Sequence, residues 1–275
     1  MKEILLAIVA LVLAGAILVA TGIVQIDATA TVKLNNTGNL TALNVTLPDS
    51  LTACVFGNAP AGIPTMLDYH GRNVTINTTI LSSELSLSGD VAPCAVMIVR
   101  DEYMSRMTRK AVKERFDSGA SLVVEKLAAT LIHDDPAVYG WEIGYPGQTL
   151  QDVLPVKMDL PNNEPEALGD VLFSGYFMVR DNFLFKGVKN FRFENWNVTK
   201  TFKTTNAATE AADLVDTLDA EVRATRTAYN GILYTRKNLG GLSVYFAIPL
   251  DASPTVTGAV LETLLYDYMQ RNYPI

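Results

Sequence analysis

The sequence predicts an α/β protein with a hydrophobic N-terminal helix, then a β-hairpin segment, then a large head in which strands and helices alternate. Three observations carry this prediction. Residues 4–24 contain neither a charge nor a proline, residues 28–48 alternate apolar and polar side chains around a turn, and residues 95–124 have the pattern of strand, helix, strand. The predicted boundaries are 1–26 for the helix, 27–57 for the hairpin and 58–275 for the head.

The apolar segment at residues 4–24 has the length of a membrane-spanning helix. About 20 apolar residues cross a bilayer, whereas the apolar part of a signal peptide usually has about 7–15. Lys2 precedes the segment, which favours an inner N-terminus and a head outside the cell. We therefore expect a retained membrane anchor, with cleavage near the small residues 28–30 as the alternative.

Six Asn-x-Ser/Thr sequons agree with a location outside the cell, because N-glycans are added to exported chains. Three of them follow the apolar segment closely and would place glycans near the membrane. The predicted glycosylation sites are Asn35, Asn39, Asn44, Asn73, Asn77 and Asn197.

The chain has two cysteines, Cys54 and Cys94, with neither a Cys-x-x-Cys spacing nor a nearby histidine. In an oxidising compartment they could form one disulfide, and in a cytosolic chain they would be two small buried side chains. They do not resemble metal ligands, and no cofactor is expected. The net charge of −7 and the lack of a basic patch interleaved with aromatic residues argue against nucleic acid as a partner.

The hairpin segment and the first part of the head follow from local patterns. One arm of the hairpin holds Val32 and Leu34, and the other holds Leu43, Val45 and Leu47. Short strands are then expected at 51–56, 65–69 and 74–80.

A strand–helix–strand unit follows in the sequence. A buried strand is predicted at Ala95–Val99, a helix capped by Ser105 ends at Gly119, and a strand at 122–124 lies parallel to the first. The predicted apolar face of the helix comprises Met107, Ala111, Val112 and Phe116. The opposite face is either solvated or meets an acidic partner, and it comprises Arg106, Arg109, Lys110, Lys113 and Arg115.

The second part of the head is predicted from shorter patterns. We expect short strands within 149–179, an acidic helix at 207–219, adjacent strands at 231–235 and 242–248, and a C-terminal helix at 257–271.

The order GDVAPCAVMIVRDEYMS, then a helix, then DSGASLVVEKLA, resembles the class I glutamine amidotransferase-like superfamily. The C-terminal NLGGLSVYFAIPLDASPTVTGAVLETLLYDYMQRN is similar to the closing strand and helix of the same group. The resemblance covers residues 65–131 and 232–275 and is greatest to uncharacterised membrane-tethered members from archaea and bacteria. It implies a Rossmann-like, amidotransferase-like head with extra β structure in the middle.

The same resemblance provides a test for catalysis. The family's catalytic members carry a nucleophilic Cys between glycines in a tight turn after the strand that matches 122–124. Here Glu125-Lys126-Leu127-Ala128-Ala129 follows, with no nucleophile and no glycine to permit a strained turn. The two histidines, His70 and His133, do not supply the family's late His-x-Glu pair. We therefore expect no catalytic residue and no enzymatic activity.

Other polar clusters have a common structural explanation beside the functional one. Residues His133–Asp135 could bind a metal, but a solvated turn is the commoner role, so no metal site is predicted. Asp68, His70, Asp101 and Glu102 could meet at the carboxyl ends of the strands and hold a small molecule or a glycan.

Two further pairs of residues leave alternatives open. Trp141 and Trp196 could line a groove, although burial is the commoner outcome for tryptophan. Glu125 and Lys126 could form a buried ion pair or simply mark the end of a strand.

These features together predict a non-enzymatic cell-surface glycoprotein, anchored by its helix, whose head serves structural or interaction roles through a protein partner or self-assembly. One alternative is a pilin-like subunit of an extracellular filament with the helices bundled in the core. Against it, only Met1-Lys2-Glu3 precede the apolar segment, without a Lys/Arg-Gly processing site. A further alternative is an exported hydrolase or glycan-binding module.

Overall fold

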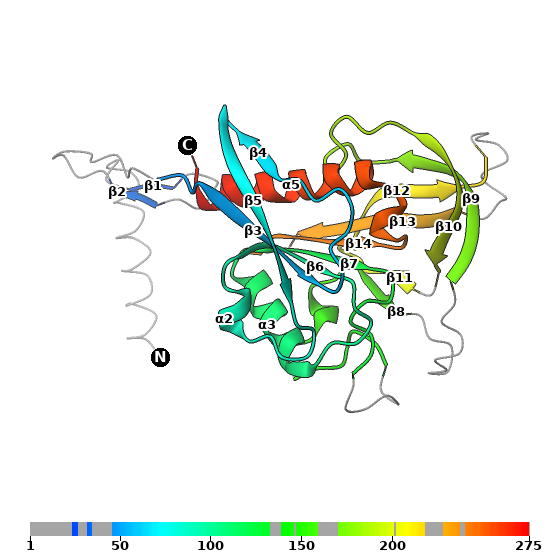
Figure 1. Ribbon diagram of the computed structural model, residues 1–275, viewed down its shortest axis with the longest axis horizontal. Helices are drawn as coiled ribbons and strands as arrows, with labels where there is room; N and C mark the ends of the chain where they lie inside the picture. The colour runs from blue at the N-terminus through cyan, green and yellow to red at the C-terminus, as the bar shows by residue number, and fades with distance from the viewer. Residues whose placement is uncertain are drawn as a thin grey trace, which may run out of the picture. The chain divides into compact units, whose positions relative to one another are not determined.

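A computed structural model describes residues 24–26, 32–34, 46–132, 139–145, 147–158, 170–200, 202–217, 228–236 and 240–274 of the 275-residue chain (Figure 1). The chain divides into two compact units, residues 1–46 and 47–275.

In the N-terminal unit, strand β1 (Val24–Ile26) pairs antiparallel with β2 (Val32–Leu34). The predicted helix therefore does not extend to residue 26, and the partner of β2 precedes it instead of following it. Five residues, 27–31, separate the two strands in the sequence, and an antiparallel pair can be joined over that length. Residues 4–23 lie outside the described residues, and no helix among those described is long and apolar enough to cross a membrane.

The head is built on one sheet of ten strands in the order β10-β9-β12-β13-β14-β7-β6-β3-β5-β4. A separate short ladder joins β8 (Val156–Met158) to β11 (Phe202–Thr204). The ten strands are β3 (Ser50–Phe56), β4 (Met66–Tyr69), β5 (Arg72–Leu81), β6 (Cys94–Val99), β7 (Ser121–Glu125), β9 (Asp170–Val179), β10 (Phe191–Thr199), β12 (Thr209–Val215), β13 (Ala228–Arg236) and β14 (Leu242–Phe246).

The sheet has two halves, which differ in the relative direction of neighbouring strands. In the parallel half, β14, β7, β6, β3 and β5 run in the same direction. In the antiparallel half, β13, β12, β9 and β10 alternate in direction. The short β4 closes the far side of the parallel half as an antiparallel edge strand.

Three α-helices belong to the described part of the head: α2 (Ser88–Val91), α3 (Arg106–Asp117) and α5 (Pro254–Asn272). Short 3₁₀ turns are η1 (Leu150–Asp152) and η4 (Leu250–Ala252). Figure 1 shows α5 on one side of the parallel half and α2 with α3 on the other. The core lies between these layers, where β6 and β7 are buried along their whole length.

The predicted strand–helix–strand unit is confirmed. β6 and β7 are parallel neighbours joined through α3. The Ser105 side chain accepts a hydrogen bond from the Thr108 N–H at 3.1 Å and so caps the helix. Gly119 has φ 110°, the left-handed conformation that ends a helix.

The predicted fold class is wrong as a whole. A Rossmann-like head needs helices alternating with parallel strands on both faces. The described sheet instead has five antiparallel neighbouring pairs beside four parallel ones, and only three α-helices accompany its ten strands. β3 lies within residues 27–57, the range predicted for the hairpin segment, and is an interior strand between β6 and β5.

The acidic helix predicted at 207–219 is also wrong, since residues 209–215 form β12. Ala, Glu and Leu favour helices, but the hydrogen bonds that β12 makes to both β9 and β13 outweigh this local preference. The residues from Ala211 to Val215 are all buried, as in an interior strand.

The predicted faces of α3 need one correction. Arg109 is fully buried and its guanidinium donates hydrogen bonds to the carbonyl oxygens of Met104, Gly140, Ile143 and Leu131 at 2.8–3.1 Å. Met107, expected on the apolar face, is 48% exposed. An arginine is tolerated at such a depth because backbone carbonyls satisfy its donors.

Candidate functional site

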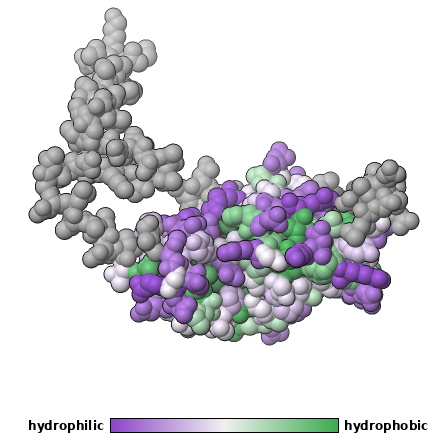
Figure 2. All heavy atoms as spheres, turned by 90° about the horizontal axis from the view of Figure 1, so that it is seen from above, coloured by the Kyte–Doolittle hydropathy of each residue, from purple (hydrophilic) through white to green (hydrophobic). Residues whose placement is uncertain are grey.

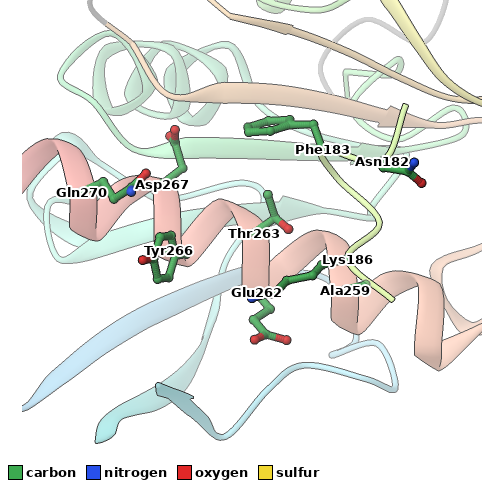
Figure 3. A pocket seen from close by; sticks show the side chains of 9 residues that line it. All are labelled: Asn182, Phe183, Lys186, Ala259, Glu262, Thr263, Tyr266, Asp267 and Gln270. Atoms are coloured by element: carbon green, nitrogen blue, oxygen red, sulfur yellow. The ribbon is translucent and has the colours of Figure 1, made fainter. Parts of the chain in front are cut away.

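Among the described residues, a groove of about 390 Å³ lies beside α5 (Figure 3). One wall is the turn after β9, and the other is the exposed side of the helix. Its lining residues are Asn182, Phe183, Lys186, Ala259, Glu262, Thr263, Tyr266, Asp267 and Gln270. Figure 2, which views the head from above, shows hydrophobic surface bordered by hydrophilic side chains on this side of the molecule.

The turn holds an aromatic side chain in solvent. Phe183 is 45% exposed, and its backbone N–H donates to Asp181 Oδ1 at 2.8 Å. The second oxygen of Asp181 accepts a hydrogen bond from the Tyr234 hydroxyl at 2.5 Å. The rings of Phe183 and Tyr234 lie 5.8 Å apart between centroids. The turn therefore fixes an exposed ring that could contact an apolar ligand face with little ordering cost.

The Tyr234 hydroxyl stays protonated over a wide pH range. Burial, followed by the hydrogen bond to Asp181 and the charge of Asp181, raises the pKa of Tyr234 to about 12. This hydroxyl therefore acts as a donor that positions Asp181, and through it the Phe183 turn.

The helical wall of the groove has few unpartnered charges. The Asp267 carboxylate is buried and receives Arg236 Nη2 at 2.5 Å and Arg271 Nε at 2.8 Å. Lys186 and Glu262 are exposed, and the floor includes the small side chains of Ala259 and Thr263. An exposed ring with a few polar groups around it suits recognition of a ligand.

An ion network lies at the carboxyl ends of β6 and β7, on the edge of the sheet where α/β proteins usually bind ligands. The Arg100 guanidinium forms an ion pair with Glu125 and a second, at 2.7 Å, with Asp251. It also donates to the Asn58 carbonyl at 2.8 Å, while Glu125 accepts from the Leu250 N–H at 3.2 Å. The network ties together the ends of β6, β7 and β14.

Charge pairing changes the pKa of Asp251. Burial of this carboxyl raises its pKa, but the hydrogen bond from the Ala61 N–H at 2.7 Å and the Arg100 guanidinium outweigh burial. The pKa of Asp251 consequently lies below its usual value. The Asp251 carboxylate is therefore charged at neutral pH and can pair with Arg100.

The four residues expected to meet at the strand ends do not all meet. Asp101 and Glu102 line a hollow of about 550 Å³ after β5 and β6, and the Ser83 hydroxyl is hydrogen-bonded to Asp101. Asp68 and His70 lie at the β4–β5 turn, which is the opposite end of β5. The antiparallel β4 causes this separation, because it returns the chain to the start of β5.

His70 instead belongs to an aromatic cluster. Its ring lies 4.6 Å from the Tyr69 ring and 6.0 Å from the Tyr266 ring, and its Nε2 is 3.4 Å from the Tyr266 hydroxyl. His133, Asp134 and Asp135 lie outside the described residues. No group of potential metal ligands occurs among the residues that are described.

A strained turn does follow β7, although the sequence contains no glycine there. Lys126 has φ 50° and its side chain pairs with Asp170 at the start of β9. Asp170 also accepts hydrogen bonds from Thr199 Oγ1 at 2.7 Å and Asn197 Nδ2 at 2.9 Å. Of the two alternatives for Glu125 and Lys126, the end of a strand is the one found: β7 ends at Glu125, and each residue pairs with a different partner.

The two tryptophans differ in burial. Trp141 is 1% exposed and donates from its indole N–H to the Ala128 carbonyl at 2.8 Å. Trp196 is partly buried and stacks on Phe193 with 4.2 Å between ring centroids. Both therefore contribute to packing, and neither lines the groove beside α5.

The cysteine pair forms a disulfide. Cys54 on β3 and Cys94 on β6 are bonded, with their Cα atoms 5.6 Å apart, and both are fully buried. Of the sequons, Asn73 and Asn77 on β5 and Asn197 on β10 are exposed. The sequons at Asn35, Asn39 and Asn44 lie outside the described residues.

The groove beside α5 was not predicted. Asp181 and Asn182 indicate a turn after an apolar strand. The next residue, Phe183, is equally compatible with a buried position in the core, so the sequence does not identify it as part of a groove. The burial of Arg109 could not be predicted either, because an arginine on a helix is normally exposed to solvent.

No described protein family matches the sequence, and no curated protein matches it. Among solved structures, a β-galactosidase from Bacillus circulans sp. alkalophilus is similar at 14% identity and TM-score 0.48, over 81% of this chain and 31% of that chain. A ThuA-like protein from Bacteroides uniformis is similar at 10% identity and TM-score 0.46, over 85% and 95%.

A cytoplasmic protein from Salmonella typhimurium is similar at 10% identity and TM-score 0.47, over 79% of this chain and 98% of that chain. This chain spans about a third or less of the β-galactosidases that it resembles. Likenesses at these low scores and identities carry no argument about function.

Proposed function

We propose that this chain is an exported, surface-attached glycoprotein without enzymatic activity, whose head serves in recognition. The apolar segment at residues 4–24 attaches the chain to the membrane, and the head lies outside the cell. The groove beside α5 is the candidate contact site.

The observation that carries the proposal is the Cys54–Cys94 disulfide in the centre of the sheet. Disulfides persist mainly in oxidising, exported compartments, whereas cytosolic thiols are kept reduced. The exposed sequons on β5 and β10 agree with the same location, because a glycan needs an accessible asparagine.

The absence of enzymatic activity is supported by the ion network at the ends of β6 and β7. The Arg100–Glu125–Asp251 network occupies the position where a sheet of this type would place reacting groups. His70, the only histidine among the described residues, contacts two tyrosines. The third alternative, a hydrolase, therefore has less support than a recognition role.

The test combines surface accessibility with thiol counting in the native cells. Intact cells are treated with a protease that does not cross membranes, and broken cells serve as the control. We expect the head to be degraded in both. A maleimide mass tag applied to the denatured chain should label neither cysteine before reduction and both after it. A head that is protected in intact cells, or two free thiols, would contradict the proposal.

A further inference from the structure

Part of β5 is an open sheet edge. β4 pairs only with Arg72–Thr75 of β5, and the last bond on that side runs from the Ile76 N–H to the Thr65 carbonyl at 2.9 Å. Figure 1 shows β4 beside one end of β5 only. Because N–H and C=O groups alternate in direction along a strand, those of Thr78 and Ile80 point to the same side, where no described strand pairs with them.

The side chains of this open stretch are also exposed. Asn77, Thr78 and Thr79 are exposed, and Ile80 is 58% exposed. Both faces of the strand are therefore accessible here, in addition to its edge. A second strand could add along Thr78–Leu81 without displacing any described element.

The sequence of this stretch lacks the usual protection against pairing. Residues 73–83 read NVTINTTILSS, with no charge and no proline. Uncharged, β-branched segments of this kind on an exposed edge favour edge-to-edge association. Charged residues, prolines and bulges are the common ways in which proteins prevent it.

The opposite edge of the sheet has that protection. β10 contains a register shift between Phe193 and Trp196, and Asn195 in the bulge has φ 55°. Arg192 and Glu194 add two exposed charges. A bulge and charges both disfavour the addition of a further strand. At β5, residues 73–83 have neither a bulge nor a charge, and they contain two sequons, Asn73 and Asn77.

We propose that an N-glycan on Asn77, assisted by one on Asn73, blocks the open edge of β5 against pairing with a second copy of this chain. The Asn77 side chain lies next to Thr78 in the strand, so its glycan would stand beside the exposed N–H and C=O groups. The glycan takes the place of the charge or bulge that this edge lacks. The inference rests on the proposed export of the chain.

The test uses the full chain, purified in detergent from glycosylating cells. Asn77→Gln removes the sequon, and Thr79→Ala removes it while keeping the asparagine. Sedimentation velocity should show that both variants form large species, with the sedimenting fraction increased about tenfold or more over wild type. Asn197→Gln, on the bulged edge, is the matched control and should remain monodisperse.

A second variant separates edge pairing from misfolding. Thr78→Lys in the Asn77→Gln background adds a charge to the edge, which the wild-type edge lacks. We expect this double variant to have the wild-type sedimentation profile. Failure of this rescue, or an Asn77→Gln variant as monodisperse as wild type, would overturn the inference.

Glycopeptide mass spectrometry of the wild-type chain tests the edge protection and the proposed export separately. Glycans on other sequons with bare Asn77 would overturn the edge protection and leave the proposed export intact. A chain with no glycan on any sequon and two free thiols would contradict the proposed function itself.

Discussion

The parallel and antiparallel halves of the sheet achieve burial in different ways. In the parallel half, β6 and β7 are buried at every position, and their sequences are continuous apolar runs. In the antiparallel half, β9 and β10 mix exposed, partly buried and buried positions, and the Phe177 ring packs against the rings of Phe185, Phe191 and Trp196. Continuous runs identify their strands in the sequence, whereas aromatic packing depends on partners distant in the chain.

The two halves also differ in their cross-links. The disulfide and the Arg100 network both lie in the parallel half. The antiparallel half relies on strand pairing, packing and a few ion pairs such as Arg180–Asp213 at 2.6 Å. The difference predicts where substitutions will cost the most stability.

The largest effect is expected from removing the disulfide. The bond closes a loop with a sequence separation of 40 residues, for which chain entropy gives about 4 kcal/mol. The double variant Cys54→Ala, Cys94→Ala should lose about that much free energy of unfolding in urea titrations. Wild type treated with a reductant is the control and should show a similar loss. An unchanged midpoint in both would mean that the cross-link does not constrain the unfolded chain.

The sequence predicted the elements of the parallel half well. The strands at 51–56, 95–99 and 122–124, the helix between the last two and the C-terminal helix are all present. Each has a strong local signal, either an apolar run or helical spacing with caps.

The antiparallel half was predicted poorly because long-range pairing overrides local preference. The residues of β12 favour a helix by composition, but they form a strand because they pair with β9 on one side and β13 on the other. The exceptions were the short strands expected within 149–179, which match β8 and β9, and the adjacent strands β13 and β14, which a glycine-rich sequence marks. The groove residues could not be predicted from the sequence, because the groove is formed by a turn and a helix that lie far apart in the chain.

A matched pair of core substitutions tests whether the two halves unfold together. Leu122 on β7 and Leu214 on β12 are both fully buried, and Leu→Ala at such sites costs about 3 kcal/mol. Because one sheet joins the halves, each variant should shift a single unfolding transition by a similar amount. Two separate transitions for Leu214→Ala by circular dichroism and tryptophan fluorescence would show that the halves are independent.

The ion network should give a smaller, pH-dependent effect. The pKa of Asp251 is lowered in the folded chain, so its stabilisation is present above the unfolded value of about 4 and is lost as pH falls through the folded pKa. Since Asp251 is half exposed, we expect Asp251→Asn to cost no more than about 1 kcal/mol at pH 7.

Urea midpoints at pH 7 and pH 3 measure this effect. The difference between wild type and Asp251→Asn should shrink at the lower pH. Asp49→Asn, at an exposed position before β3, is the control. An equal difference at both pH values would show that the carboxylate charge is not what stabilises the network.

The smallest change in stability is expected at the groove. Phe183 is 45% exposed and its turn is held by backbone and Asp181 contacts, so Phe183→Ala should change the free energy of unfolding by less than about 1 kcal/mol. Phe177→Ala, at a fully buried ring, is the contrasting variant and should cost about 3–5 kcal/mol. A large loss for Phe183→Ala would identify its ring as part of the core rather than of a recognition surface.

The disulfide has a mechanical consequence for a chain that is held by its N-terminal segment. Tension along the chain would enter the head at Leu47 and reach β3, which begins at Ser50. Only the residues from Ser50 to Ala53 can peel away, a length of about 14 Å, before Cys54 transfers the load to Cys94 on β6. Beyond that point the disulfide transfers the load to β6, so that the strand pairings of β3 and β6 resist the pull together.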